Sequence, residues 1–88
     1  MKAIMTVTGI DHTGIIAAVA SALAERDVNI LNVSQTLMGE WFTMIMQLEL
    51  NETVSIPDLQ QHMSAVEAEQ KLQIRIQSEM IFHEMHRL

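Results

Sequence analysis

A short turn near the amino end holds the residue types best suited to binding chemistry. Residues 9–14 read Gly-Ile-Asp-His-Thr-Gly and directly precede an apolar pattern of helical period. Free N–H groups and the positive dipole end at a helix start suit a carboxylate, and Gly14 lets a ligand approach the backbone. An ordinary turn, with Asp11 or Thr13 as the helix cap, explains the same residues at least as well. His12 stands where ligands often dock, although a single loop histidine more often faces solvent.

The other histidines offer metal chemistry less readily. His83 and His86 are three residues apart on an expected helix, close to Glu79 and Glu84, and the four could form a ligand set. A solvated polar face of a terminal helix is the more frequent origin of such a group, so we expect no metal and no other cofactor. His62 precedes an apolar residue of another expected helix and is predicted to lie at the surface.

The composition excludes several classes of function. The chain has no cysteine, which excludes disulfides, thiolate metal sites and cysteine nucleophiles. Eleven acidic residues against five basic ones give a net charge of −6, which argues against nucleic acid or an anionic membrane as partner. No serine lies in a strained nucleophile turn, and no nucleophile–base pair can be assembled, so we expect no enzyme. No segment resembles a signal peptide or approaches the ~18 apolar residues of a membrane helix, which favours a cytoplasmic protein.

The pattern of apolar residues predicts the elements that must hold the turn. In order they are a strand at 2–8, a helix from 15 to the polar residues 25–27, strands at 29–38 and 41–48, a helix from Ser55 to about 69, a strand at 72–77 and a short terminal helix within 78–88. Residues 39–40, Gly-Glu, predict a type II′ hairpin turn. This order is typical of an α+β fold, the ferredoxin-like βαββαβ sandwich, with a four-stranded antiparallel sheet and two helices on one face. We expect one such domain over residues 1–88.

The same periodicity predicts which side chains form the core. The apolar stripe of the first helix consists of Ile16, Val19, Ala20 and Leu23. The core face of the third strand consists of Phe42, Met44, Met46 and Leu48. Trp41 and Ile45 lie on the opposite sheet face, which also receives apolar side chains from the first two strands. Water does not suit so apolar a face, so we expect the terminal helix or a second copy of the chain to cover it, and we predict a homodimer.

Three runs of residues together resemble the ACT domain, a βαββαβ module found in regulators of amino-acid metabolism. They are GIDHTGII, DVNILNVSQT and GEWFTMIMQL, and the resemblance covers about residues 2–77. The family's turn usually reads Asp-x-Pro-Gly-Ile/Leu, so Thr13 departs from it, which puts the rigidity of the loop in doubt but not the fold. The hairpin and the terminal helix are similar to those of small stand-alone ACT proteins, and the hairpin also to that of the glycine-cleavage-system transcriptional repressor.

The resemblance implies a non-catalytic sensor that pairs with a second copy and binds an amino acid or related metabolite near the first turn. It implies one wall of the site from Asp11, His12, Thr13, Gly14 and Ile15. It implies another wall from Asn29 and Ile30. The chain carries no catalytic or DNA-binding partner domain, so a regulated protein would be a separate molecule. A different class of function stays open, namely a pure interaction or dimerisation module that binds no ligand.

Overall fold

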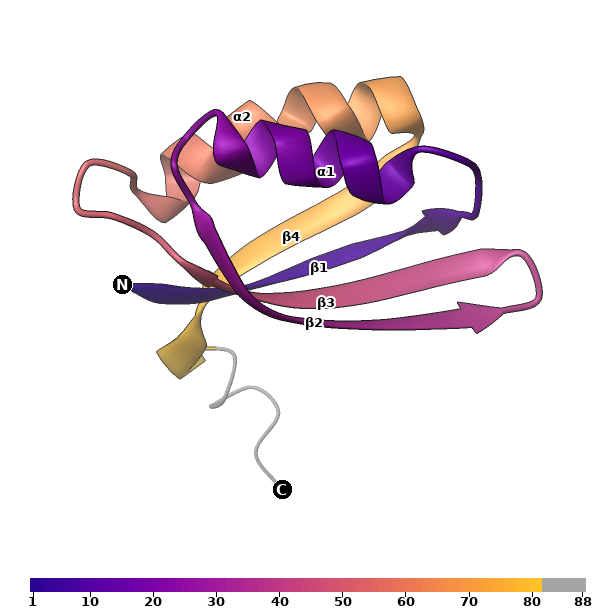
Figure 1. Ribbon diagram of the computed structural model, residues 1–88, viewed down its shortest axis with the longest axis horizontal. Coiled ribbons are helices and arrows are strands. Elements are labelled where there is room, and N and C mark those ends of the chain that lie inside the picture. The colour runs from indigo at the N-terminus through magenta and orange to yellow at the C-terminus, as the bar shows by residue number, and fades with distance from the viewer. Residues whose placement is uncertain (82–88) are drawn as a thin grey trace.

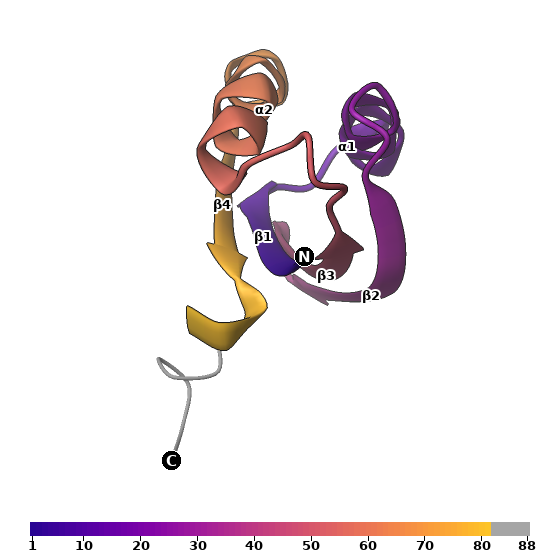
Figure 2. The same ribbon diagram turned by 90° about the vertical axis from the view of Figure 1, so that its left-hand side faces the viewer.

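The computed structural model describes residues 1–81, and its elements follow the predicted order (Figure 1). They are β1 (Lys2–Ile10), α1 (Ile15–Ala24), β2 (Asn29–Met38), β3 (Trp41–Glu49), α2 (Ile56–Gln70) and β4 (Leu72–Ser78). The strands form one antiparallel sheet in the order β2-β3-β1-β4, and both helices lie on one face of it (Figure 2). The predicted ferredoxin-like fold is therefore confirmed. Residues 79–81 begin a helical turn where the terminal helix is predicted, and the rest of that prediction lies outside the described residues.

The core lies between the sheet and the two helices. The predicted core face of β3 is confirmed, because Phe42, Met44, Met46 and Leu48 are all buried. The stripe of α1 is wrong by part of a turn. Ile15, Val19, Ala22 and Leu23 are the buried residues of α1, whereas Ile16 is 47% exposed. The β2–β3 hairpin extends beyond the start of α1 (Figure 1). Ile16 lines a cleft with Leu37 and Phe42 and is not part of the buried core.

The sheet face opposite the helices is less apolar than the sequence predicts. Across it, Thr8, Thr43 and Thr36 form a row of polar side chains on three neighbouring strands. On the hairpin side of this row, the exposed side chains of Ile10, Trp41 and Met38 form the next row, and on its other side Ile45 is 40% exposed. The two-residue alternation predicts correctly which side chains lie on each face of the sheet. Threonine is also common in β-strands, and here the threonines divide the apolar surface that the sequence predicts.

The two edges of the sheet differ in how their backbone groups are satisfied. On β4, Gln60 of α2 donates to the carbonyl of Ile74 at 2.8 Å and accepts from the N–H of Ile76 at 3.0 Å. Glu67 of α2 accepts from the N–H of Ile74 at 2.8 Å. Side chains of α2 thus close the β4 edge. Among residues 1–81, β2 is the other edge strand, and the bond from Val33 N–H to the Asn32 side chain, 2.9 Å, is local.

Candidate functional site

The turn between β1 and α1 is held by backbone contacts and starts the helix with glycine. The N–H of Asp11 donates to the carbonyl of Glu40 at 2.8 Å, which ties the turn to the β2–β3 hairpin. Gly14 is the N-cap of α1, with φ 95° in the left-handed region that favours glycine. No side chain within the described part of the chain caps this helix, so the alternative in which Asp11 or Thr13 acts as the cap is wrong.

This start of α1 leaves backbone donors available to a ligand. The first helical hydrogen bond runs from the N–H of Ala18 to the carbonyl of Gly14 at 3.0 Å. The N–H groups of the first helical turn before Ala18 have no intrahelical acceptor, and residues 1–81 provide no capping side chain for them. The first turn also holds no acidic residue. A carboxylate at this end would meet free donors and the positive end of the helix dipole.

A cleft of about 320 Å³ adjoins this helix start. It is lined by Asp11, Ile16, Gln35, Thr36, Leu37 and Phe42. Its size is at the lower end of the range for small-molecule sites, and it combines apolar walls with one carboxylate, as such sites often do. Apart from Asp11, none of these residues was singled out as a ligand contact by the sequence. Ile16 and Leu37 belong to apolar patterns in the sequence, and those patterns do not indicate that the two side chains are exposed at a cleft.

His12 faces the backbone with both ring nitrogens. Its Nδ1 lies 3.1 Å from the carbonyl oxygen of Thr13, and its Nε2 lies 3.0 Å from the carbonyl oxygen of Gln70 at the end of α2. The hydrogen bond to Gln70 and then the one to Thr13 raise the pKa of His12 above its ordinary 6.5, and the Asp11 carboxylate adds to the effect. The small desolvation of the ring opposes them. His12 therefore contacts protein atoms where the sequence suggested a ligand.

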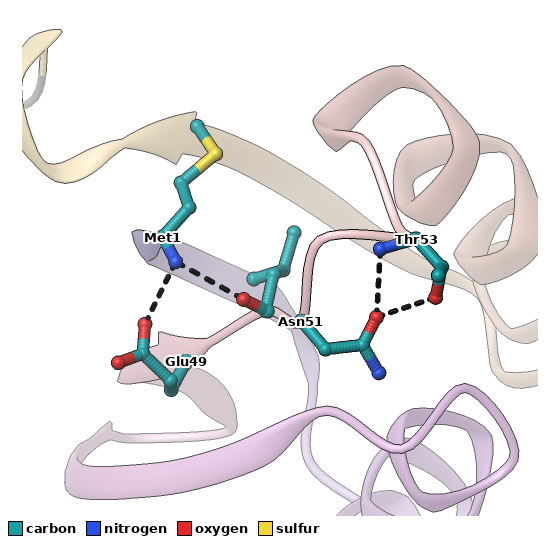
Figure 3. Close-up of polar contacts among 5 residues, drawn as sticks. Met1, Glu49, Asn51 and Thr53 are labelled. Carbon is teal, nitrogen blue, oxygen red and sulfur yellow. Dashed lines mark hydrogen bonds and ion pairs between the residues drawn. The ribbon is translucent and has the colours of Figure 1, made fainter.

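Asn29 and Ile30 lie far from the turn in the same chain. Asn29 is opposite Glu49, which is opposite Lys2, whereas the turn follows Ile10 at the other end of β1. From Lys2 to Ile10 the strand spans roughly 27 Å. Figure 3 shows the local surroundings at the Asn29 end, where the Met1 amine lies 3.1 Å from a Glu49 carboxylate oxygen and donates to the Leu50 carbonyl at 3.1 Å. One chain thus does not bring the two expected walls together.

A family model for the ACT domain matches residues 2–77. The chain belongs to the ACT domain family. Its relatives include a UPF0237 protein of Corynebacterium efficiens, which is 63% identical over 83 residues that cover 93% of each chain. Among solved structures, an ACT domain protein from Streptococcus pneumoniae is similar, with a TM-score of 0.83, 39% identity and coverage of 93% of each chain.

The predicted likeness to the glycine-cleavage-system transcriptional repressor is also found. A structure of such a repressor aligns with a TM-score of 0.76 and 18% identity, over 86% of this chain and 44% of the repressor. At that identity the match shows a shared fold alone. ACT domains are regulatory modules that bind small ligands, so the family assigns this chain a regulatory role in general terms.

The remaining candidates in this ACT chain show no second site. Residues 1–81 contain no group of three or more metal-ligating side chains, and His83, Glu84 and His86 lie outside the described residues. His62 lies between the helices, with its Nε2 2.9 Å from the Ala22 carbonyl and 3.1 Å from a Glu25 carboxylate oxygen. No helix within the described residues has both the length and the apolar character to span a membrane.

Proposed function

We propose that this ACT chain is a non-catalytic regulatory module that senses an amino acid or related metabolite as a homodimer. The observation that carries the proposal is the cleft beside the uncapped start of α1, because Asp11 and the apolar residues Ile16, Leu37 and Phe42 line it together. The family's general role as ligand-binding regulator agrees with it. The same proposal includes one domain over residues 1–88, a cytoplasmic location and a separate regulated protein.

The chemistry of the cleft favours an amino acid with an apolar side chain. Its carboxylate would accept from the N–H groups of the first turn of α1, where Gly14 leaves open space. Its ammonium group would donate to the Asp11 carboxylate. Its side chain would contact Ile16, Leu37 and Phe42, which line the cleft. These three requirements together distinguish an amino acid from a simple carboxylic acid or an amine.

A second copy of the chain would complete the site with Asn29. Met38 and Trp41 flank a two-residue turn and therefore form a hydrogen-bonded pair of the β2–β3 ladder. Such pairs alternate along an antiparallel ladder, so the N–H and C=O groups of Val33, Gln35 and Leu37 point away from β3. Antiparallel pairing of two β2 edges with Val33 opposite Gln35, with the irregularity between Ile30 and Asn32 allowed for, would set the Asn29 end of one strand beside the hairpin turn at Gly39 of the other copy. Glu40 follows Gly39 and binds the N–H of Asp11, so Asn29 of the second copy would approach the turn. For this pairing to form, the hydrogen bond from the Val33 N–H to the Asn32 side chain would have to break.

The test begins with a thermal-shift screen against the twenty amino acids, followed by calorimetric titration of any that raises the melting temperature. We expect Asn29→Ala to weaken binding about 5- to 150-fold, the equivalent of about 1–3 kcal/mol for losing a buried polar partner. Gln73→Ala serves as the matched control, because Gln73 is exposed on β4 at the far edge of the sheet. Equal affinity in wild type and Asn29→Ala would remove Asn29 from the site.

A pure interaction module is the second candidate, and one surface favours it. Ile10, Met38 and Trp41 expose 44%, 74% and 59% of their surface in one row at the hairpin end. Neighbouring exposed apolar side chains of this size often mark a protein contact. If none of the amino acids or common metabolites changes the melting temperature, this second function becomes the better description.

A further inference from the structure

His12 occupies an unusual position for an exposed loop histidine. One ring nitrogen contacts the carbonyl of the next residue in the turn, and the other contacts a carbonyl that is 58 residues away in sequence. The second carbonyl belongs to Gln70, the last residue of α2. His12 is thus the side chain that joins the β1–α1 turn to the end of the second helix.

The two partners restrict the protonation state that satisfies this geometry. A carbonyl oxygen only accepts hydrogen bonds, so each ring nitrogen of His12 must donate to its partner. A neutral imidazole carries one N–H group and one nitrogen lone pair. That lone pair would face one of the two carbonyl oxygens at hydrogen-bond distance, with no proton between them. The imidazolium carries two N–H groups and satisfies both contacts.

The surrounding charges come from both elements. Asp11 precedes His12 in the turn and favours the cation. Glu69 and Lys71 flank Gln70 in sequence and carry opposite charges. The last carbonyls of α2 form the negative end of its dipole, which also favours a cation there.

We infer that His12 is a positioning residue that fastens the turn to the end of α2 by donating two hydrogen bonds, which it does as an imidazolium. Gly14, the N-cap of α1, lies two residues after His12, so the position of the free N–H donors depends on this contact. The pH control of ligand binding that follows from it rests on the proposed function. The positioning role itself does not, because it concerns the turn alone.

The direction of the pH effect follows from the raised pKa of His12. A group whose pKa is higher in the folded state contributes stability below its unfolded value of 6.5, and this contribution is lost as the pH rises through the folded pKa. The turn should therefore be held most firmly at mildly acidic pH and should loosen at alkaline pH. Any amino acid bound through the turn should bind more weakly there.

Two measurements on the full chain test the inference without a ligand. An NMR titration of the ring nitrogens, assigned by the His12→Gln variant, should show a midpoint above 6.5, with the doubly protonated ring as the major form at pH 6.5. The amide signals of Gly14 and Ile15 should shift with the same midpoint. The melting temperature of the wild type should fall from pH 6 to pH 8.5 by more than that of His12→Gln, which keeps an N–H donor but does not titrate.

His62→Gln is the matched control, since His62 lies between the helices, away from the turn, where its Nε2 contacts the Ala22 carbonyl and a Glu25 carboxylate oxygen. This variant should keep the larger pH dependence of the wild type. A His12 midpoint at or below 6.5 would overturn the inference, as would equal pH profiles for wild type and His12→Gln. Absence of ligand binding would contradict only the proposed function, because neither measurement depends on it.

Discussion

At Gly14 the backbone conformation, and not the packing, requires glycine. A Cβ added there would meet no heavy atom within 4 Å, but φ is 95°, which L side chains rarely adopt. We expect Gly14→Ala to lower the free energy of unfolding by about 1–2 kcal/mol, the usual cost of a left-handed conformation for an L residue. Urea unfolding measures this loss. Gly14→Asn should cost less, because asparagine tolerates this region better, and equal stability of Gly14→Ala and wild type would contradict the argument.

Single residues also show what the sequence could and could not predict about the site. The family resemblance implies Asp11 as a site residue, and Asp11 lines the cleft beside α1, so its contact with a ligand stays a prediction. The contact of His12 with Gln70 could not be predicted, because it depends on how α2 lies on the sheet. The sequence predicts Ile16 in the core, but Ile15 is the buried residue, because helical periodicity indicates a stripe and not which of two adjacent apolar residues packs on the sheet. Local patterns specify local geometry, whereas contacts distant in sequence need the assembled fold.

Among the elements, α2 closes one edge of the sheet with its own side chains. Gln60 and Glu67 are two helical turns apart, so both face β4, and they bond three backbone groups that a neighbouring strand would otherwise use. The element order and the core face of β3 were predicted correctly from alternation and turn residues. The closure of the β4 edge was not predicted. Polar residues on a helix normally indicate a face exposed to solvent, unless it is known how that helix packs on the sheet.

Opening the β4 edge should therefore change how the chain associates. The double variant Gln60→Ala with Glu67→Ala should lose about 1–3 kcal/mol of stability, for a few hydrogen bonds removed. It should also form species larger than those of the wild type, because an unpaired strand edge recruits other chains. Light scattering at several concentrations measures this. The control variant Gln61→Ala changes an exposed residue of the same helix. If this control also forms larger species, the effect comes from changing α2 in general and not from opening the β4 edge.

Two features of the whole molecule favour the same arrangement of two copies, in which their β2 edges pair. The edge of β2 is open, and the residues of the expected site lie at opposite ends of one chain. The sequence predicted a dimer from an apolar sheet face, but the threonine row breaks that face. Pairing of β2 edges instead uses the strand that α2 does not seal and would bring the turn of one copy close to Asn29 of the other. The proposed dimer would therefore be better explained by backbone pairing than by burial of the opposite face.

Two variants distinguish these interfaces. The backbone of Gln35 faces away from β3, so Gln35→Pro should remove an outward N–H without breaking a bond of the β2–β3 ladder. We expect the wild type to be a dimer by light scattering at micromolar concentration and Gln35→Pro to be a folded monomer with a cooperative melting transition. Trp41→Ser changes the apolar row of the opposite face and should leave the dimer intact. The reverse pattern would place the interface on that face, and a monomeric wild type would exclude a site shared between two copies.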